Sequence, residues 1–116
     1  MNPSLLIIIA SDPRSSARPA EAIRIAAGVG TWKKTDVSVY LREAAVLALS
    51  EFVDELVDEE NFTRYFPITG EWGRPIYVQK GARLLAELGQ ATLPYQEISD
   101  AELAALAARH SYVARF

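Results

Sequence analysis

The sequence predicts an α/β fold: a three-layer α/β/α sandwich around a five-stranded, mainly parallel sheet. Short apolar segments alternate along the chain with segments of helical periodicity, and right-handed crossovers turn that order into a parallel sheet covered by helices on both faces. The first segment, residues 5–10, is apolar without interruption, as a strand covered on both faces must be. A length of 116 residues suits a single domain, spanning 1–116.

The first half of the chain carries the clearest patterns. After the strand at 5–10 comes the polar loop "SDPRSSAR", and Pro19 then fits the first turn of a helix. Residues 36–41 alternate between apolar and polar side chains as a second strand does. Residues 43–57 are predicted to form one helix, whose buried stripe consists of Val46, Leu49, Val53 and Leu56.

The second half is expected to begin with a long irregular connection, "EENFTRYFPITGEWGR", of the kind that is often functional or used in assembly. A third strand at 75–79 leads into a short helix that ends at Gly89. A weak fourth strand covers 95–98. The run "SDAE" is a capping box that starts the last helix at Ser99, and residues 112–116 form a short edge strand.

The composition excludes several function classes. The chain has no cysteine, which rules out disulfides, thiolate catalysis, persulfide carriage and thiolate metal sites. The net charge is −3, and the Lys and Arg residues are scattered, so neither a nucleic acid nor an anionic membrane is an expected partner.

No metal or cofactor is expected either. The single histidine leaves too few zinc ligands, and the acidic run at 54–60 lacks the alternating ligands and the glycine of a calcium loop. That run is typical of a solvated helix end. The apolar run at 5–10 is too short for a membrane span and has no basic leader before it, so a cytoplasmic location is expected.

Polar residues follow three of the predicted strands. Ligands of open parallel sheets bind outside the carboxyl ends of the strands, so the loop at 11–18, the turn at 42–43 and the turn at 79–81 should converge. The first loop offers hydroxyl and guanidinium groups ahead of a helix N-terminus, which favours an anion. The predicted ligand-binding residues are Ser11, Asp12, Ser15, Ser16, Arg18, Arg42, Gln79, Lys80 and Gly81.

These residues also have plainer interpretations. Serines and Asp12 in the first loop serve equally well as caps in a solvated connection. Lys80 would bind a carboxylate or act as a base if it were buried, but most lysines lie on the surface. Gly81 lets a ligand approach closely or simply eases the turn.

Four aromatic residues crowd the predicted irregular connection: Phe62, Tyr65, Phe66 and Trp72. Their spacing matches no single helix face. So many rings are hard to bury in a small domain, which predicts an interface with another subunit. The alternative is that they fold back as a lid over the core.

The chain resembles the DsrE-like family of sulfur-relay and related proteins over nearly its whole length. The resemblance is carried by "LLIIIASDP", "PAEAIRIAAGV", "VSVYLREAAVLAL", "PIYVQKGARLLAELG" and "SDAELAALAARHSYVARF". It implies a small three-layer α/β/α domain that assembles with copies of itself as a dimer, trimer or hexamer. Relatives that carry sulfur place a cysteine at the end of the strand represented here by residues 76–79, where this chain has Gln79, Lys80 and Gly81.

Three functions remain open. The favoured one is an oligomeric DsrE-like domain without persulfide chemistry that binds a small polar or anionic ligand, or a protein partner. The second is a cysteine-independent enzyme that uses Lys80 or Asp12 as acid or base. The third is a purely structural subunit of an assembly.

Overall fold

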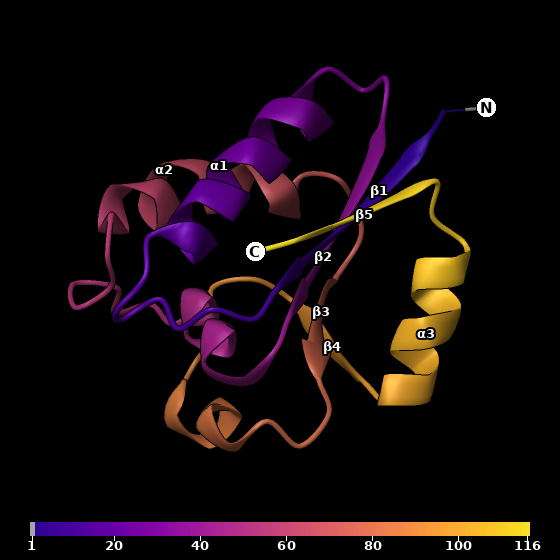
Figure 1. Cartoon of the computed structure of the whole chain (residues 1–116). Helices are drawn as coiled ribbons and strands as arrows, with labels where there is room; N and C mark the ends of the chain where they lie inside the picture. The colour runs from indigo at the N-terminus through magenta and orange to yellow at the C-terminus, as the bar shows by residue number, and fades with distance from the viewer. Residues whose placement is uncertain (1) are drawn as a thin grey trace.

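A computed structural model describes residues 2–116 and contains one five-stranded sheet in the order β4-β3-β2-β1-β5 (Figure 1). Every neighbouring pair of strands is parallel. The predicted α/β fold class is therefore confirmed. The strands are β1 (Ser4–Ile9), β2 (Asp36–Leu41), β3 (Ile76–Gln79), β4 (Tyr95–Ile98) and β5 (Tyr112–Arg115).

Helices cover both faces of the sheet. Figure 1 shows α1 (Arg18–Thr31) and α2 (Glu59–Gly70) on one side and α3 (Asp100–Ala108) on the other. The chain adds β2, β3 and β4 in one direction from β1, and α3 then carries it back across the opposite face to β5. Two short 3₁₀-helices, η1 (Glu43–Leu49) and η2 (Arg83–Glu87), lie beyond the carboxyl ends of β2 and β3.

The apolar run in β1 reflects its central place. Ile7 and Ile9 pack into the large core beneath α1 and α2, whereas Leu6 and Ile8 pack into the smaller core beneath α3. Because both faces of the strand are covered, neither set of alternate positions tolerates polar side chains. The prediction of a doubly covered first strand is confirmed.

The predicted helix at 43–57 is wrong beyond its first turns. Only η1 is helical, and Ser50 is extended and forms an antiparallel bridge with Ala91. The amide of Thr92 donates to the carbonyl oxygen of Leu49, which draws the chain away from a helical path. The predicted apolar stripe is nevertheless buried, at Val46, Leu49, Val53 and Leu56.

The predicted irregular connection is also wrong, because most of it forms α2. Phe62, Phe66 and Thr69 recur at helical spacing and all three are buried in the same helix. Tyr65 and Trp72 are half-buried and pack against the same core. The four aromatics thus fold back onto the sheet of their own chain, and a contact of this segment with another subunit stays a prediction.

Two turn signals in the second half are confirmed. Gly89 has a φ of +66° directly after the helical turn of η2, although that turn is 3₁₀ and not α-helical. The capping box is complete: the Ser99 hydroxyl accepts from the amide of Glu102, and the Glu102 carboxylate accepts from the amide of Ser99.

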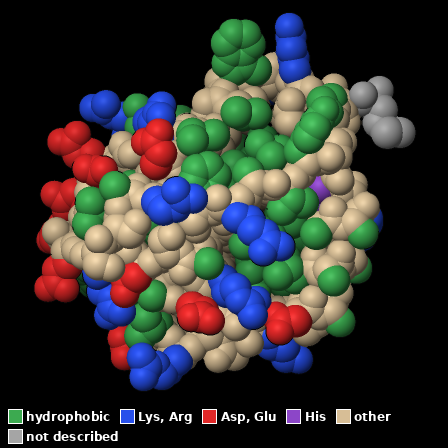
Figure 2. Space-filling view, viewed as in Figure 1, with side chains coloured by type: hydrophobic (Ala, Val, Ile, Leu, Met, Phe, Trp, Pro, Cys, Tyr) green, Lys and Arg blue, Asp and Glu red, His purple; other side chains and the backbone are tan. Residues whose placement is uncertain are grey.

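Charged side chains are distributed unevenly over the surface. Figure 2 shows acidic side chains gathered at the left edge of the molecule, where the segment leading into α2 lies, and basic side chains over its centre and lower part. The acidic segment runs from residue 51 to residue 60 and contains no Lys, Arg or His. One end of the molecule is therefore strongly acidic although the net charge is only −3.

Candidate functional site

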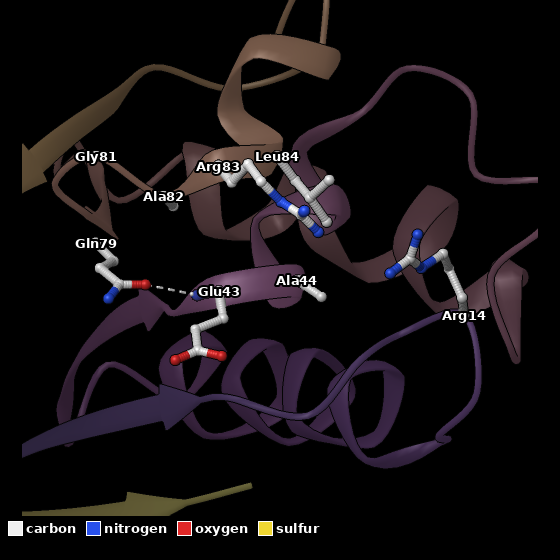
Figure 3. A pocket seen from close by; sticks show the side chains of 8 residues that line it. All are labelled: Arg14, Glu43, Ala44, Gln79, Gly81, Ala82, Arg83 and Leu84. Atoms are coloured by element: carbon white, nitrogen blue, oxygen red, sulfur yellow. Dashed lines mark hydrogen bonds between the residues drawn. The ribbon is translucent and has the colours of Figure 1, made fainter.

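A cavity of about 330 Å³ lies beyond the carboxyl ends of the strands, and we call it the carboxyl-edge cavity (Figure 3). Because β1 and β3 are parallel, the loop after β1 and the turn after β3 leave the sheet at the same edge. Both contribute to the cavity, as the sequence predicted. It is lined by Arg14, Glu43, Ala44, Gln79, Gly81, Ala82, Arg83 and Leu84.

A strained backbone position forms one wall of this cavity. Glu43 has a φ of +53°, in the left-handed region that costs a non-glycine residue about 1–2 kcal/mol. Its amide donates to Oε1 of Gln79 at 2.9 Å, which ties the start of η1 to the end of β3. That side-chain hydrogen bond fixes the backbone at the point where β2 and β3 reach the cavity.

Two guanidinium groups flank the open space. Figure 3 shows Arg14 and Arg83 pointing toward one another across it. Arg83 is exposed, and within residues 2–116 it has no ion pair or side-chain hydrogen bond. Arg14 is paired with Asp12, with 2.9 Å between Nη2 and Oδ2. Arg83 is thus the cation with the most remaining hydrogen-bonding capacity for an incoming anion.

The ion pair between Asp12 and Arg14 holds the first loop in shape. Nε and Nη2 of Arg14 both donate to the Asp12 carboxylate, and the Arg14 amide donates to it as well. These hydrogen bonds, above all those from the guanidinium, hold the pKa of Asp12 below its ordinary value of 3.8. Near neutral pH the Asp12 carboxylate is therefore ionised and hydrogen-bonded to Arg14, which makes it a weak general base.

Asp12→Asn tests this ion pair through pH. The carboxylate has a lowered pKa in the folded state, so it contributes stability above its ordinary pKa of 3.8 and loses that contribution as the pH falls through its folded-state pKa. We expect Asp12→Asn to be less stable by up to about 1 kcal/mol near neutral pH, since the pair is partly exposed. Urea denaturation should show that difference shrinking below the ordinary pKa. A difference that is constant with pH would contradict the ion-pair account.

The other residues of the first loop lie outside the carboxyl-edge cavity. The Ser16 hydroxyl accepts from the amide of Arg18, the first residue of α1, in line with the plainer capping interpretation. Arg18 lies over the ring of Phe116, 5.5 Å from its centre, and donates to the carbonyl oxygen of Arg115. Arg18 and Phe116 therefore occupy the point between β1 and β5 where the strand order reverses.

Arg42 and Lys80 are also directed elsewhere. Arg42 donates to the hydroxyl of Tyr40 at 3.1 Å and to Asp100 at 2.9 Å, on the side of the sheet that carries α3. Burial raises the pKa of Tyr40, which is fully covered and remains a neutral phenol. Lys80 is exposed and is not among the residues that line the cavity. Of the predicted ligand-binding residues, the structure brings Gln79 and Gly81 into the cavity.

The remaining lining residues were not among the predicted ligand-binding residues, although Arg14 and Glu43 lie in segments that were predicted to converge there. Arg83 comes two residues after Gly81. Its closeness to the predicted turn at 79–81 was the signal that could have identified it as a lining residue. Glu43 belongs to the turn at 42–43 that was predicted to converge on this edge, and Ala44 follows it in η1. Arg14 lies in the predicted loop itself, between the selected residues Asp12 and Ser15.

Neither a metal centre nor a membrane segment is found in the described part of the chain. Within residues 2–116, no cluster of three or more carboxylate or imidazole groups is arranged to hold a metal ion. In the same range, no helix combines the length and the apolar character that crossing a bilayer requires.

Comparison with known proteins identifies the fold. No model of a known protein family matches the sequence, and no curated protein is similar enough to count as a relative. The crystal structure of the YchN protein from E. coli is similar to this chain over the full length of both, with a TM-score of 0.76 and 19% sequence identity. At that identity the likeness establishes architecture alone, and it supports the conclusion that this chain has a DsrE-like fold.

Proposed function

We propose that this protein is a DsrE-like domain that binds a small anionic molecule in the carboxyl-edge cavity and works without persulfide chemistry. The observation that carries the proposal is the pair of guanidinium groups, Arg14 and Arg83, facing one cavity at the carboxyl edge of a parallel sheet. Arginine presents a planar fork of donors that matches a carboxylate or a phosphate. Open α/β sheets bind their ligands at this edge.

The cavity also limits the size and character of the ligand. A volume of about 330 Å³ is at the lower end for small-molecule sites, so the ligand is a compact metabolite and not an extended cofactor. The side-chain amide of Gln79 is held by the amide of Glu43, which leaves its NH₂ group as a further donor. Glu43 also lines the cavity, but Figure 3 shows its carboxylate directed away from the two guanidinium groups, so it does not oppose an anion between them.

The two residues considered for acid–base chemistry do not strengthen the enzyme hypothesis. Asp12 is occupied by Arg14, and its pKa is lowered by that contact. Lys80 lies in solvent outside the cavity lining. A general base needs both a poised pKa and hydrogen-bonding distance from substrate, so binding is the function proposed here. Self-assembly and a cytoplasmic location remain predictions.

Thermal unfolding in the presence of small anions tests the proposal. Phosphate, short dicarboxylates, hydroxy acids and nucleoside monophosphates would be screened, and at least one should raise the Tm. A ligand at one hundred times its Kd stabilises the folded state by about 2.7 kcal/mol. Arg83→Ala should abolish the shift, whereas Arg109→Ala, which removes an exposed arginine after α3, should retain it. No shift with any of these anions, or equal loss in both variants, would count against the cavity.

A further inference from the structure

Two aromatic side chains are left largely uncovered by their own chain. Trp32 is 73% exposed and Phe52 is 76% exposed, more than the other large hydrophobic residues that the structure leaves at the surface. Exposed single hydrophobic residues are common, but an exposed large ring beside a groove marks a contact surface more often. Trp32 lies beside basic side chains, whereas Phe52 lies in an acidic segment of the chain.

Trp32 borders a shallow groove of about 480 Å³ on the outer side of α1, which we call the Trp32 groove. Ile25 and Val29 give it an apolar floor, and Gly28 opens it because no side chain fills that position. Its lining is Arg24, Ile25, Gly28, Val29, Trp32, Lys34 and Thr35, which includes two cations and no carboxylate. Figure 2 shows this region as hydrophobic side chains with basic ones beside them at the top of the molecule.

The groove remains positively charged after its ion pair on α1 is taken into account. Glu21 forms an ion pair with Arg24 one turn away on α1, so Arg24 is largely neutralised. Lys34 and its neighbour Lys33 are both exposed and have no ion pair within residues 2–116. The groove therefore suits an apolar group that is accompanied by carboxylates.

Phe52 projects from a segment with the opposite charge, residues 51–60, which we call the Phe52 loop. Val53 and Leu56 are buried in the core and hold the loop, and the Phe52 amide donates to the hydroxyl of Ser50. The ring is thereby presented outward from an anchored backbone. Asp54 and Glu55 line a hollow together with the ring and with Arg14, which is already paired with Asp12. The rest of the segment adds the carboxylates of Glu51, Asp58, Glu59 and Glu60.

We infer that the Trp32 groove of one copy of this chain receives the Phe52 loop of a second copy. An apolar ring flanked by carboxylates is complementary to an apolar groove flanked by lysines, both in hydrophobic character and in charge. Pairing the groove with itself would bring Lys33 and Lys34 against their counterparts, and pairing the loop with itself would oppose its carboxylates. The contact is therefore heterologous, between two different surfaces of the same chain.

The two surfaces cannot meet within one molecule. Trp32 follows the last residue of α1, whereas the Phe52 loop lies near its start, where the amide of Val57 donates to the carbonyl oxygen of Pro13. A helix of 14 residues is roughly 21 Å long, so the Trp32 end of the groove lies about the length of α1 from the Phe52 loop of the same chain. This contact would account for the predicted self-assembly and does not depend on anion binding.

Mixing two variants tests the contact directly. Trp32→Ala loses the groove but keeps the Phe52 loop, and Phe52→Ala loses the loop but keeps the groove. Light scattering at micromolar concentration should show the unaltered protein as an oligomer and each variant alone as a monomer. An equimolar mixture of the two should form a species of twice the monomer mass, because one intact contact remains possible. High salt should weaken it.

Controls separate the alternatives. Tyr112→Ala removes another exposed aromatic, 65% exposed on β5 and outside both surfaces, and should leave the oligomer intact. Circular dichroism confirms that each variant is folded. A monomeric unaltered protein, a mixture that stays monomeric, or an equal effect of Tyr112→Ala would each overturn the inference. The anion-induced Tm shift should persist in Trp32→Ala, so failure of this contact and failure of the carboxyl-edge cavity give different results.

Discussion

Replacing Phe66 by alanine is expected to lower the free energy of unfolding by about 3–5 kcal/mol. Phe66 lies in α2, is 1% exposed, and is among the largest fully buried side chains of the protein. Its removal leaves a void in the core between α2 and the sheet, which the rigid strands cannot fill. Domains of this size are stable by about 5–15 kcal/mol, so the variant would unfold at far lower denaturant concentration.

Arg64→Ala is the matched control, because Arg64 lies on the exposed face of the same helix. Exposed substitutions of this kind change stability by about 0.5 kcal/mol or less. Urea denaturation followed by far-ultraviolet circular dichroism should give a large drop in the midpoint for Phe66→Ala and little change for Arg64→Ala. Equal midpoints would mean that residues 59–70 are not packed on the sheet.

The strands were the most predictable part of the fold. Residues 36–41 and 95–98 were predicted with the bounds that the structure has, and the other strands differ by a residue at their ends. This success has a physical basis, since a strand in the middle of a covered sheet must be apolar on both faces, and its pattern is visible locally. The parallel arrangement followed from the alternation of strands and helical segments.

The segment between β2 and β3 was predicted wrongly because its determinants are not local. Val46, Leu49, Val53 and Leu56 have helical spacing and are buried, yet the bridge between Ser50 and Ala91 redirects the chain. Nothing near Ser50 in the sequence signals a partner so distant. Conversely, α2 forms although it contains Pro67, which has no backbone N–H to donate within the helix. The spacing of Phe62, Phe66 and Thr69 was the overlooked helical signal.

The sheet edge that carries the cavity could be predicted, but of the predicted ligand-binding residues only Gln79 and Gly81 line the cavity. The parallel sheet brings the turns after β1 and β3 to one edge, and that geometry needs no knowledge of side chains. Which cations face the cavity depends on contacts far apart in sequence. Arg18 is held by Phe116, and Arg42 by Asp100. Those contacts keep Arg18 and Arg42 out of the cavity, which Arg14 and Arg83 line instead.

Gly30→Ala is expected to destabilise the protein by about 1–3 kcal/mol, although alanine favours helices over glycine by about 1 kcal/mol. Gly30 is buried near the end of α1, and a Cβ atom there would lie 2.1 Å from Cζ2 of Trp72. The indole must therefore move. It is also stacked with the guanidinium of Arg74, 5.8 Å from the ring centre, and that group donates to the carbonyl oxygen of Val37. Displacing Trp72 thus disturbs the contact between the end of α2 and β2.

Gly28→Ala, on the same helix, is expected to raise the free energy of unfolding, whereas Gly30→Ala lowers it. A Cβ at Gly28 meets nothing within 4 Å of its own chain, so in the Trp32→Ala background, where the contact with a second copy is already lost, this substitution should stabilise the protein by about 0.5–1 kcal/mol through helix propensity. Urea denaturation of the two variants should therefore move the midpoint in opposite directions. If the clash is the cause, Trp72→Leu should cost less in the Gly30→Ala background than in the unaltered protein. Equal effects in both backgrounds, or stabilisation by Gly30→Ala, would show that Trp72 does not pack against α1 at this glycine.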